Sequence, residues 1–146
     1  MSDYDEAKTW ISLAERDYTV ATHLHTTLIP KPIEIICFHC QQAVEKALKA
    51  VLAYYGADIP KTHDITLLIK LCSVHTNAKL TDEKAADTIT TFAVVARYVE
   101  DNRDFTEDTA KFALKQAQQT LEMVKQYLAK SEKEQKDKDQ KEETPK

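Results

Sequence analysis

The sequence contains very few of the residues that interrupt helices, with one glycine and four prolines among 146 residues. An all-β domain of this length needs many tight turns, so this scarcity argues against a sandwich or a barrel. No run of eighteen apolar residues occurs, which argues against a transmembrane helix. The first residues, MSDYDEAK, are acidic and lack the apolar region of a signal peptide. We therefore expect a cytoplasmic, helical protein.

Strong charge of one sign is also missing, since the net charge is −4. No global basic field is available to drive non-specific binding of nucleic acid, although a local basic site is compatible with this balance. The three cysteines, Cys37, Cys40 and Cys72, fit a reducing compartment. Cys37 and Cys40 form a CxxC pair, but they fall in the middle of an apolar stripe and no second pair completes a zinc site. We interpret them as core residues and expect neither a metal nor a cofactor.

The longest amphipathic pattern lies between Pro32 and Gly56. Proline suits the first position of a helix, and glycine suits the position just past its end. The apolar residues recur at spacings of three and four, and they are Ile33, Ile36, Cys37, Cys40, Val44, Ala47, Leu48, Val51 and Tyr55. The other faces carry His39, Gln41, Gln42, Glu45, Lys46 and Lys49. This pattern predicts the central helix of a bundle.

Four further helices are predicted from the same periodicity and from capping residues. The first of them runs from about Asp5 to Thr26, and a short one runs from Ile65 to His75 with Asp64 or Thr62 as its cap. The other two begin after a Thr81 cap and after a Thr106 or Asp104 cap. Short links between long helices predict an all-α, up-and-down bundle of four long helices and one short helix over residues 1–130. Residues 131–146 contain only polar residues and one proline, so we expect a fraying helix end and then a charged, disordered tail.

One carboxylate, Asp17, falls on the apolar stripe of the first helix. Burying a carboxylate without a partner is costly, which leaves two alternatives. In the first, Asp17 is half-exposed at the edge of a groove. In the second, it forms a salt bridge with Lys46, Lys49 or Arg97 and orders a site.

Four segments together resemble the HEPN family, the "higher eukaryotes and prokaryotes nucleotide-binding" domains, over about residues 5–129. They are AERDYTVA in the first helix, FHCQQAVEKALKAVLAYYG in the second, KTHDITLLI after it and ARYVED at the end of the fourth. The resemblance implies a HEPN-like helical bundle that pairs as a homodimer. It also implies a link to nucleotides or RNA, and a minimal nucleotidyltransferase as partner in a toxin–antitoxin module. Many members are metal-independent ribonucleases with an Arg-x(4–6)-His motif.

The sequence departs from that motif. Arg97 takes the arginine position, but the three positions open to the histidine hold Asn102, Arg103 and Asp104. Histidine can act as a general base or acid at neutral pH, whereas arginine keeps its proton. The resemblance therefore implies a binding or partner protein without efficient catalysis. An active endoribonuclease would need a substitute histidine, for which His39 and His63 are the candidates.

The expected phosphate-binding site collects Arg97, Tyr98, Asn102, Arg103, Lys61 and Lys46, together with Glu100, Asp101 and Lys49. Arginine and lysine can hold a phosphate, and a tyrosine can stack on a base. The alternative is a solvated helix end in which Arg97 pairs with Asp101. His63 can likewise play a structural role by hydrogen bonding to Asp64. A purely structural interaction module is the third functional alternative.

Overall fold

The computed structural model describes residues 3–95 and 105–143, and all regular secondary structure in this part of the chain is helical. The elements are α1 (Tyr4–Thr27), α2 (Ile33–Tyr54), α3 (Ile65–Ser73), the 3₁₀ helix η1 (Glu83–Ala85), α4 (Ala86–Val95) and α5 (Glu107–Glu143). The predicted all-α bundle is confirmed. The periodicity of the apolar residues predicted the helices correctly because the chain contains few residues that break helices.

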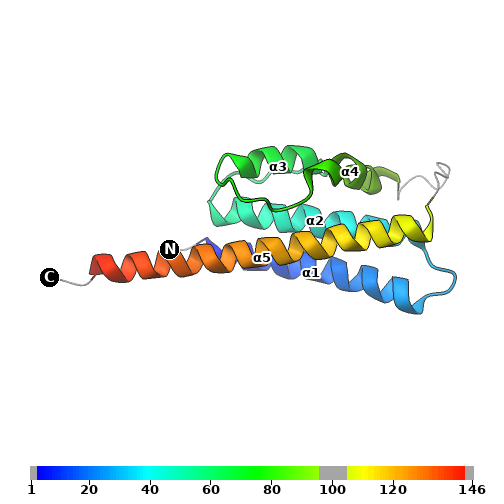
Figure 1. Ribbon diagram of the computed structural model, residues 1–146, viewed down its shortest axis with the longest axis horizontal. Helices are drawn as coiled ribbons and strands as arrows, with labels where there is room; N and C mark the ends of the chain where they lie inside the picture. The colour runs from blue at the N-terminus through cyan, green and yellow to red at the C-terminus, as the bar shows by residue number, and fades with distance from the viewer. Residues whose placement is uncertain (1–2, 96–104, 144–146) are drawn as a thin grey trace.

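Helix α2 lies at the centre of the bundle. Helices α1 and α5 lie along one side of it, and the shorter α3 and α4 lie together on the other side (Figure 1). All four of these helices pack against α2. The apolar stripe predicted from Ile36 to Val51 is buried throughout, and Ile36 and Leu48 have no exposed surface. At the end of the stripe, Tyr55 is 37% exposed, so its assignment to the core was wrong.

The two ends of α2 lie next to the proline and the glycine from which they were predicted. Pro32 immediately precedes the helix, and its carbonyl accepts a hydrogen bond from the backbone N–H of Ile36 at 3.0 Å. Gly56 follows the helix with a φ of +65°, a conformation in which a side chain would be strained. A Cβ atom at Gly56 would also lie 3.0 Å from Oδ2 of Asp3 at the start of α1. The only glycine is therefore needed where the chain turns beside the N-terminus.

The polar face predicted for α2 needs a correction. Gln41, Glu45 and Lys49 are 0%, 3% and 6% exposed, so this row of residues is buried rather than solvated. The linker after Gly56 returns along α2 and brings α3 and α4 over this side of the helix (Figure 1). A second side of α2 is thereby covered, which the width of the apolar stripe did not indicate.

Capping at the later helices agrees with the predictions in part. Asp64 caps α3, where its Oδ1 accepts a hydrogen bond from the backbone N–H of Leu67 at 3.2 Å. Thr106 Oγ1 accepts from the backbone N–H of Thr109 at the start of α5. The predicted cap Thr81 is wrong, because Asp82 accepts from the backbone N–H of Lys84 at 2.9 Å and starts η1 instead.

Helix α5 continues to Glu143 and projects past the other helices (Figure 1). Residues 131–143 are thus helical in the structure. The division of the chain into a bundle and a charged, disordered tail stays a prediction. Lysine, glutamate and glutamine have high helix propensity, and side chains four positions apart can pair. One such pair is Gln135 and Asp139, whose side chains hydrogen-bond at 3.0 Å.

Candidate functional site

Asp17 of α1 joins two polar side chains of α2. Its Oδ2 lies 2.6 Å from Nζ of Lys46, and its Oδ1 lies 3.0 Å from Nδ1 of His39. The Asp17 side chain is only 12% exposed, so the alternative of a half-exposed carboxylate is wrong. Lys46, one of the three partners considered for Asp17, supplies the compensating charge. The pair ties α1 to α2 close to the surface.

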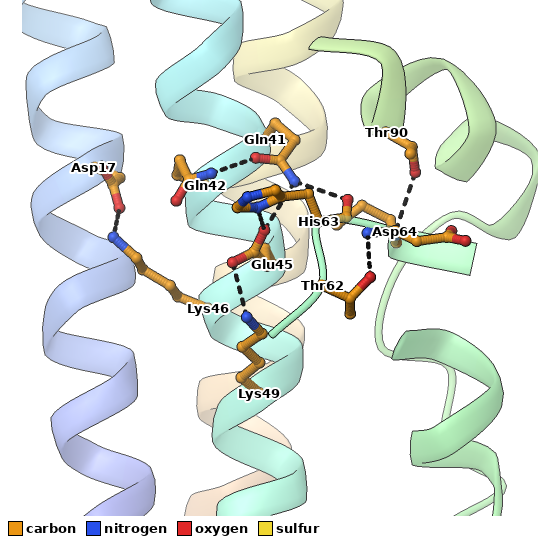
Figure 2. A network of polar contacts seen from close by, with 11 residues as sticks. Asp17, Gln41, Gln42, Glu45, Lys46, Lys49, Thr62, His63, Asp64 and Thr90 are labelled. Carbon is orange, nitrogen blue, oxygen red and sulfur yellow. Dashed lines mark hydrogen bonds and ion pairs between the residues drawn. The ribbon is translucent and has the colours of Figure 1, made fainter. Parts of the chain in front are cut away.

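A second carboxylate, Glu45, accepts three hydrogen bonds on the side of α2 that faces α3 (Figure 2). The donors are Nδ1 of His63 at 2.7 Å, Nζ of Lys49 at 3.0 Å and Nε2 of Gln41 at 3.1 Å. The Glu45 side chain is 5% exposed and that of Lys49 is 8% exposed. An ion pair this deeply buried needs such additional hydrogen bonds to offset the cost of removing its charges from water.

Gln41 extends this network to the linker after α2. Its amide nitrogen also donates to the backbone carbonyl of His63 at 3.1 Å, and its Oε1 accepts from Nε2 of Gln42 at 2.7 Å. Thr62 Oγ1 accepts from the backbone N–H of Asp64 at 3.1 Å. The His63 side chain hydrogen-bonds to the carboxylate of Glu45, in place of the bond to Asp64 that the sequence suggested. The sequence placed Glu45 on a polar face of the helix, and its i, i+4 spacing from Gln41 and Lys49 was the signal that could have found the network.

Both candidate histidines are oriented by a carboxylate. A carboxylate oxygen only accepts, so Nδ1 of a neutral His39 or His63 must carry the proton and Nε2 must carry the lone pair. Within the described residues, neither Nε2 atom has a hydrogen-bond partner. The side chain of His63 is 53% exposed, against 26% for His39. His39 lies toward α1 and His63 lies over Glu45, so the two imidazoles belong to different sides of α2.

The expected phosphate ligands fall into three groups. Lys46 and Lys49 are paired with Asp17 and Glu45, which offsets their charge. Lys61 is exposed in the linker between α2 and α3. The remaining expected site residues, Arg97, Tyr98, Glu100, Asp101, Asn102 and Arg103, lie outside the described residues. The phosphate site as a whole stays a prediction.

The cysteines occupy the core, as predicted. Cys37 and Cys40 have no exposed surface and Cys72 is 2% exposed. Burial raises the pKa of the Cys37 and Cys72 thiols to about 12, and it raises that of Cys40 at least as strongly. These sulfurs are therefore protonated at neutral pH and poor nucleophiles. Residues 3–95 and 105–143 contain no cluster of three or more His, Cys, Asp or Glu side chains that could hold a metal ion.

Thiol reactivity should report this burial directly. We expect a disulfide reagent such as DTNB to modify the native protein at pH 8 at least about a hundredfold more slowly than the urea-unfolded protein, where thiols recover a pKa near 8.5. The release of thionitrobenzoate measures both rates. Fast modification of one or more thiols in the native protein would contradict the core assignment.

The fold has α2 at its centre, with Gln41 and Glu45 of this helix hydrogen-bonded to His63 of the following linker. A model of the HEPN domain matches residues 7–127. The chain belongs to the HEPN family. The crystal structure of an archaeal HEPN homologue is 26% identical with a TM-score of 0.65, and the match covers 84% of this chain and 97% of that chain. A crystal structure from Thermus thermophilus is 23% identical with a TM-score of 0.65, covers 82% and 96% of the two chains, and supports the fold alone.

Among curated proteins, none matches this HEPN chain. The HEPN fold is associated with nucleotides and RNA, and HEPN domains commonly dimerise. None of the helices within the described ranges combines the length and the apolar content that a membrane span needs.

Proposed function

We propose that this HEPN chain is a cytoplasmic homodimer that binds a nucleotide or RNA through phosphate contacts and partners a minimal nucleotidyltransferase in a toxin–antitoxin-like module, without efficient catalysis. The observation that carries the proposal is Arg97 at the motif's arginine position with Asn102, Arg103 and Asp104 at the positions open to histidine. Arg97 and Arg103 supply charge for a phosphate, while Tyr98 supplies a ring for stacking.

The missing histidine matters because of the chemistry of metal-free RNA cleavage. A base must take the proton of the 2′-hydroxyl, and an acid must protonate the leaving 5′-oxygen. An arginine stabilises negative charge on the phosphate but exchanges no proton at neutral pH. A site built on Arg97 alone therefore binds and polarises a phosphodiester without completing its cleavage.

An active endoribonuclease with a substitute histidine is the second candidate. It is favoured by the 2.7 Å contact between Nδ1 of His63 and the buried carboxylate of Glu45. The carboxylate holds the imidazole in one tautomer, and the exposed Nε2 of His63 has the lone pair that a general base requires. His39 is held in the same way by Asp17 but is less exposed.

Replacing Arg97 by alanine should weaken binding of a fluorescently labelled, single-stranded RNA at least about tenfold, because a hydrogen bond between charged groups is lost. Fluorescence anisotropy at low and moderate salt measures the effect. The matched control is Arg16→Ala, an exposed arginine of α1, which should bind like the parent protein. Equal affinities for the parent and Arg97→Ala proteins would contradict the phosphate site.

The same preparations separate the candidate functions. Under the main proposal, RNA stays intact in the presence of a chelator, sedimentation gives a dimer, and a nucleotidyltransferase encoded nearby copurifies. Cleavage that His63→Ala or His39→Ala abolishes would establish the second candidate instead. A protein that neither binds RNA or nucleotides nor cleaves RNA would be a structural interaction module.

A further inference from the structure

A cavity of about 230 Å³ lies at the C-terminal end of α3, where the chain turns toward η1. Leu48 of α2 and Cys72 of α3 contribute buried apolar surface to its floor. Asn77, Lys79 and Glu83, which are all exposed, contribute to its polar rim. None of these residues belongs to the proposed phosphate site.

The walls of this cavity are fixed at both ends. On the α3 side, the backbone N–H of Thr76 donates to the carbonyl of Cys72 at 3.1 Å, and Thr76 Oγ1 accepts from the backbone N–H of Ala78 at 3.0 Å. On the far side, the hydroxyls of Thr81 and Thr120 share a hydrogen bond of 2.7 Å, and Thr120 of α5 is 1% exposed. The cavity is therefore formed before any ligand arrives, which lowers the entropic cost of binding.

The lining of the cavity combines an apolar floor with a polar rim. The floor is uncharged, because the Cys72 thiol has a raised pKa and donates to the carbonyl of Leu48 at 3.5 Å. Within the described residues, the side chains of Asn77, Lys79 and Glu83 have no hydrogen-bond partner. The volume is below the roughly 300–1,000 Å³ of sites for drug-sized ligands, so it fits a single ring system.

A second hollow of about 340 Å³ lies on the α5 side of the same loop. Lys79, Thr81 and Glu83 line both hollows, so the second hollow lies directly beside the first. The second hollow also contains Asp82 and Lys84, so two lysines face two carboxylates. This balance leaves no net attraction for a phosphate, and an uncharged substituent such as a ribose fits better.

We propose that this cavity binds the base of a nucleoside, with the carboxylate of Glu83 accepting hydrogen bonds from the base edge. Guanine fits best, because its N1–H and N2–H donors lie side by side and match the two oxygens of a carboxylate. Uracil presents a single N–H between two carbonyl oxygens, which a carboxylate repels. The cavity shares no lining residue with the phosphate contacts proposed for Arg97, and it recognises the base of the ligand rather than its charge.

Calorimetric titration of the full chain with guanosine, guanosine monophosphate and uridine tests the proposal. Guanosine should bind at least about tenfold more tightly than uridine, the discrimination expected of a bidentate contact. The monophosphate should bind no more tightly than guanosine, and added salt should change neither affinity. Absence of guanosine binding at millimolar concentration, together with absence of binding to a guanine-containing oligoribonucleotide, would overturn the proposal.

Three variants and one control substitution locate the site. Glu83→Gln should remove the preference for guanosine over uridine, whereas Glu6→Gln on exposed surface of α1 should keep it. Ala78→Trp should fill the cavity and abolish binding of both nucleosides, with the helical circular dichroism unchanged as a check of folding. Arg97→Ala should leave guanosine binding intact even where it weakens RNA binding. Loss of guanosine binding in Arg97→Ala, or unchanged binding in Ala78→Trp, would refute the assignment.

An oligoribonucleotide distinguishes the two sources of the base. If free guanosine binds and the oligoribonucleotide binds no better, the ligand is a free nucleoside. If the oligoribonucleotide binds more tightly and Glu83→Gln weakens it, the cavity reads a base of single-stranded RNA.

Discussion

Replacing Lys49 by methionine is expected to lower the free energy of unfolding by about 3 kcal/mol, since removal of one partner leaves a buried charge uncompensated. The partner left behind is Glu45, whose side chain is 5% exposed. Gln41 and His63 would still donate hydrogen bonds to this carboxylate, but the ammonium charge that lies 3.0 Å from it would be gone. Methionine keeps the length of the side chain, and its sulfur can contact the Trp10 ring that Lys49 Nζ approaches at 5.8 Å. Urea unfolding followed by circular dichroism measures the change.

A surface ion pair provides the matched control. Lys125 lies 3.3 Å from Glu15, and both side chains are about half exposed. The substitution Lys125→Met should cost less than about 0.5 kcal/mol, because water screens exposed pairs. In the double variant Lys49→Met/Glu45→Leu, most of the lost stability should return, since no unpaired charge is left. A cost below about 1 kcal/mol for Lys49→Met alone would mean that the network contributes little to the fold.

Replacing Leu52 by alanine is expected to cost about 3 kcal/mol, within the 2–5 kcal/mol typical of a large buried side chain that leaves a cavity. Leu52 is 1% exposed near the end of α2, the helix on which α1, α3, α4 and α5 all pack. Neighbouring helices that contact one another, as α1 and α5 do, have limited freedom to move into the space.

The matched control for Leu52 is Leu67 on α3, which is 39% exposed. The substitution Leu67→Ala should cost less than about 1 kcal/mol, because a partly exposed side chain loses less burial and leaves no cavity. Chemical unfolding under identical conditions compares the two variants. Equal costs for the two substitutions would show that α2 is not the centre of the core.

The two polar networks on α2 have a consequence for any site on this helix. They hold Lys46 and Lys49 against carboxylates and hold His39 and His63 in fixed orientations. Substitution of Glu45 or Asp17 would therefore alter both stability and the position of an imidazole. The substitutions Arg97→Ala and Glu83→Gln leave both carboxylates in place and therefore give cleaner tests of function.

Much of the fold could be predicted from local signals. Helix α1 was expected from about Asp5 to Thr26 and runs from Tyr4 to Thr27. The end of α2 at Gly56 and the Asp64 cap of α3 were also predicted, because a left-handed residue and a capping carboxylate act on their own neighbours. The point at which α5 ends was harder to predict, since polar composition says little against a helix when no glycine or proline stops it before Pro145.

The sequence by itself determined the helical class, the central place of α2 and the inert role of its CxxC pair, because periodicity and capping are properties of neighbouring residues. It also established that no histidine follows Arg97 at motif spacing. Only the tertiary structure decided that Glu45 and Lys49 are buried and that Asp17 pairs with Lys46. Those contacts depend on where α1 and the linker before α3 pack against α2, and this packing is set by residues distant in the sequence.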